Sequence, residues 1–213
     1  MRRKVNLIYQ KLHRAFGPQH WWPAESSFEV IVGAILTQST SWKNGEKAIG
    51  NLKKHKVLTA KKLYRLKSRK LATYIRPAGY YNIKTKRLKA FLKFFFEKYR
   101  GNLKRLSQKP LLILRQELLA VNGIGPESAD SILLYALGKP AFVVDAYTKR
   151  IFSRHRLIKE SVSYDETQDF FRQNLKNEVK LFNEYHALLV KLGKDYCLKR
   201  IPRCAECPLK NQK

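Results

Sequence analysis

The spacing of apolar residues limits the possible folds most, because it is helical along nearly the whole chain. Within 28–36, 88–96 and 181–192, apolar residues recur every three or four positions, which predicts helices with buried faces. Glycine and proline breaks separate these segments at ordinary helix lengths. Strand-like alternation occurs only around 141–144, which is too short to indicate a sheet. We therefore predict an all-α chain of nine or ten helices without internal repeats.

The charge of the chain indicates its partner. The sequence has 44 Lys and Arg against 16 Asp and Glu, a formal net charge of +28. A folded protein with this excess is expected to bind a polyanion, and nucleic acid is the default. A merely solubilising surface is the alternative. A membrane surface is disfavoured because the basic residues are spread over the chain and not gathered on one amphipathic helix.

The chain shows no signal for a membrane or for secretion. No apolar run approaches the roughly 18 residues that a span requires, and no apolar core follows the basic N-terminus, as a signal peptide would need. The three cysteines all lie near the C-terminus, a pattern more typical of metal binding than of disulfides. We expect a cytoplasmic monomer.

One apolar helix is predicted to end at a Gly-x-Gly turn, where a second begins. Gly123 and Gly125 allow positive φ angles and a close backbone approach, and Pro126 suits a first helical turn. The start of the second helix is then a candidate phosphate site. The alternative is an ordinary helical corner with a glycine cap.

A carboxylate follows the next apolar run, because Asp145 comes directly after Phe142-Val143-Val144. This position predicts a residue at the edge of the core. The residue could simply cap a helix that starts near Ala146, or it could be a catalytic carboxylate.

Four motifs, taken in order, resemble one family. They are Ile35–Thr40 with Gln38, the turn Gly79-Tyr80-Tyr81-Asn82-Ile83-Lys84, the Gly-x-Gly hairpin followed by Val144-Asp145, and the tail Cys197-x6-Cys204-x2-Cys207. Together they resemble the helix-hairpin-helix DNA glycosylases of the endonuclease III superfamily, from about residue 28 to the C-terminus.

The resemblance implies an architecture and a reaction. It implies two helical lobes, 25–138 and 1–24 with 139–213, with a DNA-binding cleft between them. Such enzymes flip a base out of double-stranded DNA and break its N-glycosidic bond. By resemblance, Asp145 stabilises the positive charge that grows on the sugar.

The family's strand-cleaving members place a lysine nucleophile in the helix that follows the hairpin, and the matching position of this chain is Glu127. The resemblance therefore favours hydrolysis alone, leaving an abasic site, although Lys139 or Lys149 could be a substitute nucleophile. It also implies DNA contacts through Gln38 as a wedge, through Gly123 and Gly125, and through Glu127 and Lys149.

The tryptophans suggest the lesion. Trp21, Trp22 and Pro23 precede the first core helix, and Trp42 follows the Gln38 turn. Electron-rich rings bind cations, and an alkylated purine such as 3-methyladenine is cationic. The arrangement is most similar to the 3-methyladenine glycosylase III branch. Alternatively, Trp21 and Trp22 fill a seam between the lobes.

The cysteine tail departs from the family's pattern. Cys197, Cys204 and Cys207 match three ligands of a [4Fe–4S] cluster, but the fourth position is Lys213. Either three thiolates hold a labile cluster, or the loop has lost it and keeps only basic residues. Zinc would also need a fourth ligand.

Three functions remain open. The first is a glycosylase acting on a damaged, alkylated base in double-stranded DNA. The second is an endonuclease III-like enzyme for oxidised pyrimidines or mismatches, and the third is a non-catalytic DNA-binding module. We interpret His186 as core packing and the cluster 84–87 as either a solvated face or a phosphate contact.

Overall fold

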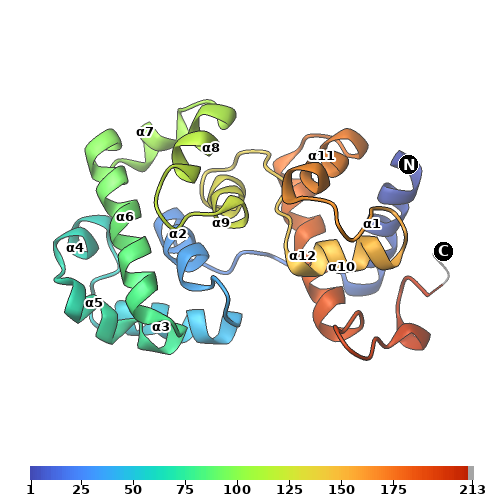
Figure 1. The fold of residues 1–213 in the computed structure, drawn as a ribbon, viewed down its shortest axis with the longest axis horizontal. Coiled ribbons are helices and arrows are strands. Elements are labelled where there is room, and N and C mark those ends of the chain that lie inside the picture. The colour runs from blue at the N-terminus through green and yellow to red at the C-terminus, as the bar shows by residue number, and fades with distance from the viewer. Residues whose placement is uncertain (211–213) are drawn as a thin grey trace. The chain divides into compact units, whose positions relative to one another are not determined.

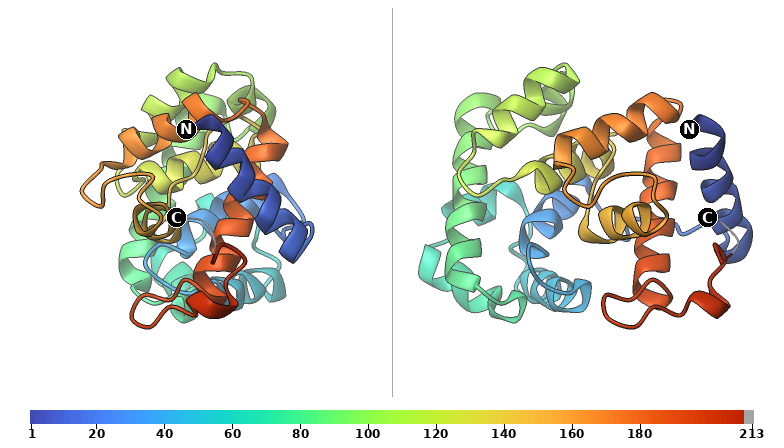
Figure 2. Two further views of the ribbon diagram at one scale, coloured as in Figure 1. Left: turned by 90° about the vertical axis from the view of Figure 1, so that its right-hand side faces the viewer. Right: turned by 45° about the vertical axis from the view of Figure 1, so that its right-hand side comes forward.

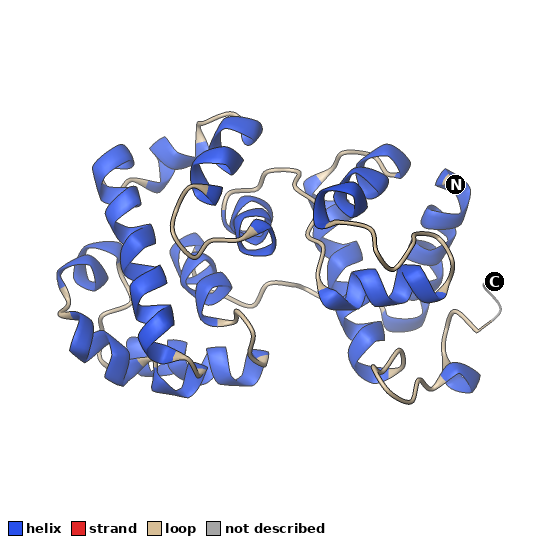
Figure 3. Cartoon of the chain, in the orientation of Figure 1, coloured by secondary structure: helices blue, strands red, loops and turns tan. Residues whose placement is uncertain are grey.

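The computed structural model describes residues 1–210, which are helical without a strand (Figure 3). The all-α prediction is confirmed, and none of these helices is long and apolar enough to cross a membrane. The helices are α1 (Arg2–Phe16), α2 (Ser27–Leu36), α3 (Trp42–Lys54), α4 (Ala60–Arg65), α5 (Ser68–Tyr74), η1 (Arg76–Ala78), α6 (Tyr81–Tyr99), α7 (Leu103–Ser107), α8 (Leu111–Leu119), α9 (Pro126–Ser131), η2 (Ile132–Ala136), α10 (Ala146–Arg154), α11 (Tyr164–Asn174), α12 (Val179–Asp195) and η3 (Cys204–Glu206).

The described residues contain twelve α-helices, where the sequence predicted nine or ten. The additional ones are short, since α4, α5 and α7 have only 6, 7 and 5 residues. Two turns are too few to show a period in the apolar pattern. Two of these helices begin at capping side chains, because Thr59 and Asn102 each accept a hydrogen bond from an N–H in the first turn.

The chain forms two compact units, Met1–Pro23 with Pro140–Lys213 and Ala24–Lys139. In the first unit, α12 packs against both α10 and α1. Figures 1 and 2 show α1, in blue, running beside α12. The core of this unit is aromatic: Phe142 stacks on Phe171 of α11 with 3.9 Å between ring centroids, and the Tyr185 hydroxyl donates to the carbonyl of Val5 at 2.8 Å. This core anchors the backbone just before Asp145.

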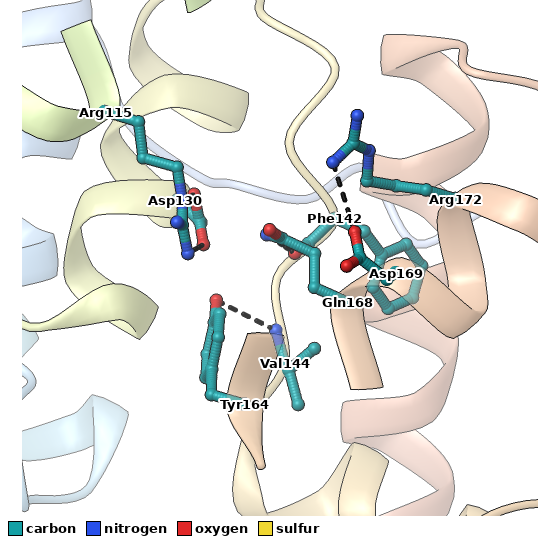
Figure 4. Close-up of polar contacts among 8 residues, drawn as sticks. All are labelled: Arg115, Asp130, Phe142, Val144, Tyr164, Gln168, Asp169 and Arg172. Carbon is teal, nitrogen blue, oxygen red and sulfur yellow. Dashed lines mark hydrogen bonds and ion pairs between the residues drawn. The ribbon is translucent and has the colours of Figure 1, made fainter. Parts of the chain in front are cut away.

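The segment 142–144, which precedes α10 in the first unit, is held by side chains of α11. The Tyr164 hydroxyl accepts a hydrogen bond from the Val144 N–H at 3.3 Å, and Gln168 donates to the Phe142 carbonyl at 2.7 Å. Figure 4 shows both residues turned toward this segment, which is extended and is not part of a sheet. Backbone groups that would pair in a strand are thus satisfied by side chains.

The second unit is built around α2. Every residue from Phe28 to Leu36 is buried, and the helix packs against α3, α6, α9 and η2. A second buried contact joins α8 to α9, where Arg115 Nε and Nη2 lie 2.9 and 3.2 Å from the two carboxylate oxygens of Asp130 (Figure 4). The two helices of the hairpin are therefore linked by a bidentate ion pair, which fixes their relative orientation.

Candidate functional site

Gly123 is required by the fold of the hairpin. Its φ is +84°, which favours glycine, and a Cβ at this position would lie 2.2 Å from Cγ of Arg87. Any side chain would therefore be strained and would displace Arg87. The predicted positive φ is confirmed here.

Gly125 differs from Gly123. Its φ is −88°, so the expectation of a positive φ at both glycines is wrong at this position. A Cβ would meet no atom within 4 Å, and the residue is exposed. The unbound protein therefore has no need for glycine at 125. A close approach of an external group to the backbone would account for it.

The Gln38 side chain joins three elements of the second unit. Its Nε2 donates to the Gly123 carbonyl at 3.0 Å and to Ser128 Oγ at 2.8 Å, and its Oε1 accepts from Arg87 Nη1 at 2.7 Å. Both ends of the amide are thus engaged within the protein. A wedge role for Gln38 would require breaking these bonds, and it stays a prediction.

Lys84 anchors two turns at one point. This lysine is fully buried, and its Nζ donates to the carbonyls of Leu36 at 2.9 Å and Ala78 at 2.7 Å. Burial and the nearby Arg87 charge lower its pKa to about 8. Lys84 therefore does not belong to a solvated face. The Gln38 turn and the turn before α6 both begin beside its ammonium group.

Tyr80 is the exposed residue of the second turn. Its side chain is 70% exposed and its φ is +45°, directly before α6. An exposed aromatic ring on a basic protein is suited to stacking on a nucleic-acid base. The sequence motif of this turn predicts no role for Tyr80.

Asp145 combines the two roles that the sequence left open. It is the N-cap of α10, where its Oδ1 accepts from the Thr148 N–H at 2.7 Å. The predicted capping position is thus confirmed. Its side chain is only 11% exposed, and its Oδ2 lies 3.6 Å from Nε2 of His186. An N-cap requires only the hydrogen bond between Oδ1 and the Thr148 N–H. The other oxygen, Oδ2, is therefore not needed for capping and lies beside the His186 imidazole.

The ionisation of Asp145 follows from these contacts. Burial alone raises the pKa of a carboxyl group, but His186 and the Thr148 N–H outweigh it, so that the pKa of Asp145 is lowered. The carboxylate is therefore charged at neutral pH inside a mostly buried site. His186 contributes to this, so its interpretation as core packing is incomplete. The two residues are 41 positions apart, and no local pattern connects them.

The three tryptophans are half-buried, and they belong to two different units. The rings of Trp21 and Trp22 lie 5.4 Å apart, centre to centre, at 57°, and Pro23 after them is exposed. Trp42 is the first residue of α3 in the other unit. Their assembly into a base pocket stays a prediction.

The remaining predicted DNA contacts are Glu127 and Lys149. Glu127 is exposed in the first turn of α9, at the hairpin. Lys149 is partly buried on α10, and its Nζ donates to the carbonyl of Val162. Of the two, only Glu127 is placed on the hairpin itself.

The cysteine tail does not present a four-thiolate ligand set. Cys197, Cys204 and Cys207 line one cavity of about 450 Å³, and two sulfurs accept hydrogen bonds at 3.4 Å, Cys197 from Arg154 and Cys207 from the Leu209 N–H. Within residues 1–210, however, no three metal-binding side chains lie close enough to hold an ion. The fourth position, Lys213, lies outside the described residues and is not a thiol.

Comparison with known families identifies the family of the chain. A model of the HhH-GPD superfamily of base excision DNA repair proteins matches residues 32–177. The chain belongs to this superfamily. The match includes Gln38, the hairpin and Asp145, so these groups lie in the part that the superfamily shares.

Individual relatives agree with this assignment. A Methanocaldococcus jannaschii protein, provisionally named as a DNA repair glycosylase, is 52% identical over 97% of this chain and 94% of its own. The endonuclease III of Thermotoga maritima is 29% identical over 86% of this chain and 81% of its own. The chain is accordingly a DNA repair glycosylase of the HhH-GPD/endonuclease III family.

A solved structure supports the same conclusion. The Helicobacter pylori 3-methyladenine DNA glycosylase, bound to 1,N6-ethenoadenine, matches with a TM-score of 0.79 and 31% identity, over 89% of this chain and 97% of that one. An endonuclease III–DNA complex matches with a TM-score of 0.85 over the whole chain, and its 20% identity shows the fold alone.

Alanine substitutions at the two hairpin glycines should have opposite effects on the stability of the free protein. Gly125→Ala should keep or slightly raise the stability of the free protein, by up to about 1 kcal/mol, because alanine restricts the unfolded chain. It should weaken duplex binding, since a methyl group now separates the backbone from phosphate. Gly123→Ala should destabilise the protein by more than about 1 kcal/mol. Urea unfolding and fluorescence anisotropy with duplex DNA measure the two effects, and unchanged binding by Gly125→Ala would contradict this account.

Replacing His186 should change the pH dependence of base release. His186→Gln removes the imidazole that helps to hold the pKa of Asp145 down, so burial then raises the carboxyl pKa. If base release requires the Asp145 carboxylate to be ionised, activity is lost as pH falls through its pKa, and the acidic limb of the rate profile should move to higher pH in this variant. Single-turnover base release over a pH series measures the shift. His55→Gln, an exposed histidine of the other unit, is the control, and identical limbs in both variants would exclude the electrostatic role.

Proposed function

We propose that the protein hydrolyses the N-glycosidic bond of a damaged, alkylated purine in double-stranded DNA and leaves an abasic site. The observation that carries this proposal is Asp145, a mostly buried carboxylate that stays ionised beside His186. A negative charge held in a low-dielectric site stabilises a developing cation more strongly than one in water.

The proposed reaction requires little more than this charge. The bond between the sugar C1′ and the base nitrogen breaks, and its electron pair leaves with the base. The sugar becomes positively charged, and the oxygen of water then bonds to C1′ and releases one proton. Asp145 stabilises the sugar cation and orients the water. Because Asp145 is also tied to Thr148, α10 fixes its carboxylate before substrate arrives.

A lyase step is disfavoured by the residues at hand. A Schiff base requires an amine, and Glu127 supplies a carboxylate at the hairpin position. The Lys149 amine already donates to a backbone carbonyl. We therefore expect no covalent DNA adduct on borohydride treatment, and an adduct would instead support an endonuclease III-like enzyme.

The substrate assignment rests on charge and on the aromatic residues. An alkylated purine such as 3-methyladenine is cationic and has a weakened glycosidic bond, so no general acid is needed. Trp21, Trp22 and Trp42 would offer it π-faces, to which cations are attracted. The Helicobacter pylori relative, a 3-methyladenine glycosylase that binds an ethenoadenine, supports a purine substrate.

In the proposed complex, the second unit binds DNA through the hairpin and the turn before α6. Gly125 admits a backbone phosphate, whereas Tyr80 is positioned to stack in the duplex. We assign Gln38 the task of holding the hairpin to α6, since its amide is fully engaged. The protein acts as a monomer in this proposal.

The donor set in the tail argues against a resident iron–sulfur cluster. Three thiols and a lysine do not reproduce four thiolates, and no step of the reaction is assigned to the tail. Its exposed basic residues, Lys199, Arg200 and Arg203, would instead favour binding to phosphates.

Asp145→Asn tests the catalytic role. Asparagine keeps the cap and the volume but removes the charge, so stability should fall by about 1 kcal/mol or less. Base release from alkylated duplex in a single turnover should fall at least about 100-fold, while duplex binding is kept. Full excision activity in this variant would overturn the assignment and would leave Asp145 as a cap only.

The tail prediction concerns metal content. If the cluster is absent, purified protein should be colourless and should contain iron and acid-labile sulfide well below one cluster per chain, because a three-thiolate cluster is labile. Elemental analysis of protein purified without oxygen measures this. Brown protein with four irons per chain, bleaching on oxidation, would contradict the prediction.

A further inference from the structure

The second unit contains a groove whose lining residues all lie outside the hairpin. It lies between α5, η1 and α6, and its volume is about 600 Å³. Three cations from three different elements line it: Arg69 of α5, Arg76 of η1 and Lys86 of α6. No carboxylate is among the lining residues. A surface that brings together three separately positioned cations without a counter-charge is suited to an anion.

The sequence around the groove shows the same excess of basic over acidic residues. Residues 47–96 contain sixteen Lys and Arg and not one Asp or Glu. Some of these cations are used internally, because Lys84 and Lys89 donate to backbone carbonyls. Lys86, Arg69 and Arg76 are exposed. The groove is therefore surrounded by positive charge that no nearby acidic residue of this segment neutralises.

A buried hydroxyl supplies an independent observation. Thr85 also lines the groove, although it is 4% exposed, and its Oγ1 has no hydrogen-bond partner in the structure. A buried polar group without a partner is costly. In mid-helix, a threonine hydroxyl commonly bonds to the carbonyl four residues before it, and Thr85 does not. The Oγ1 atom is itself closed to solvent, so a ligand oxygen in the groove would satisfy it after rotation of the Thr85 side chain.

We propose that this groove binds a phosphodiester of the DNA backbone, at a point separate from the hairpin. The inference rests on the proposed DNA substrate. Arg69, Arg76 and Lys86 supply the charge, and Thr85 donates a hydrogen bond to a phosphate oxygen.

The position of the groove favours DNA over a small free anion. Tyr81 and Asn82 line it and follow Tyr80 directly in the chain. From Tyr80 to Lys86, α6 rises about 9 Å at roughly 1.5 Å per residue. Phosphates of one strand are spaced about 3.4 Å along the duplex axis, so a duplex that stacks on Tyr80 has a phosphate within about three nucleotides of the groove.

Thr85→Val is the most specific test, because it replaces a hydroxyl with a methyl group of the same shape. The melting temperature should stay equal or rise, since a buried group without a partner is removed. Affinity for an undamaged duplex should fall about 10-fold, the loss expected for one hydrogen bond to a charged group. A lower melting temperature with unchanged affinity would show a structural hydroxyl and would overturn the proposal.

Salt dependence tests the cations. The pair Arg76→Gln with Lys86→Gln should reduce the slope of log K against log salt by about 1, the contribution of one phosphate contact. The matched control pair, Lys61→Gln with Lys104→Gln, removes two exposed charges outside the groove and should change the slope much less. Equal changes in both pairs would indicate diffuse charge and would overturn the site.

Methyl NMR of Thr85 distinguishes the sources of phosphate. The Thr85 methyl resonance should shift on adding undamaged duplex. A shift with inorganic phosphate but not with duplex would identify a small-anion site, and no shift with either would exclude the groove. Because undamaged DNA is used, failure of base release would refute the proposed function without altering these results, and failure here would leave base release intact.

Discussion

The arrangement of the hairpin and its neighbouring turns depends on the three hydrogen bonds of the Gln38 amide. They join the turn after α2 to the hairpin and, through Arg87, to α6. Arg87 in turn occupies the space beside Gly123 that a side chain would take. Gly123, Gln38 and Arg87 thus hold one another in position. The buried ammonium group of Lys84 donates hydrogen bonds to the two neighbouring turns. The hairpin is therefore rigid before DNA arrives, which reduces the ordering cost of binding.

In the first unit, the carboxylate of Asp145 stays charged although it is mostly buried. The aromatic core fixes the segment before Asp145, and Thr148 and His186 stabilise the negative charge. An N-cap is a favourable place for this, because the start of α10 offers an N–H that would otherwise lack a partner. Capping and catalysis therefore use the same carboxylate in the proposed mechanism, through different oxygens.

The sequence predicted those features that are local. The helices with long apolar periods, the Gly-x-Gly hairpin and the cap at Asp145 all depend on residues within a few positions of each other. It did not predict Gln38 beside Gly123, 85 residues away, or Arg87 beside Gln38, 49 residues away. The contact between His186 and Asp145 is likewise tertiary. Even at the hairpin, the pattern could not separate Gly123, which the fold requires, from Gly125, which it does not.

The identity of the released base tests the account's central claim most directly. Wild-type protein should be incubated with two duplexes, one alkylated and one carrying oxidised pyrimidines, and the free bases identified by mass spectrometry. We expect release of a cationic alkylated purine from the first duplex, with the strand left unbroken at an abasic site. Release of oxidised pyrimidines alone, or binding of both duplexes without any released base, would contradict it.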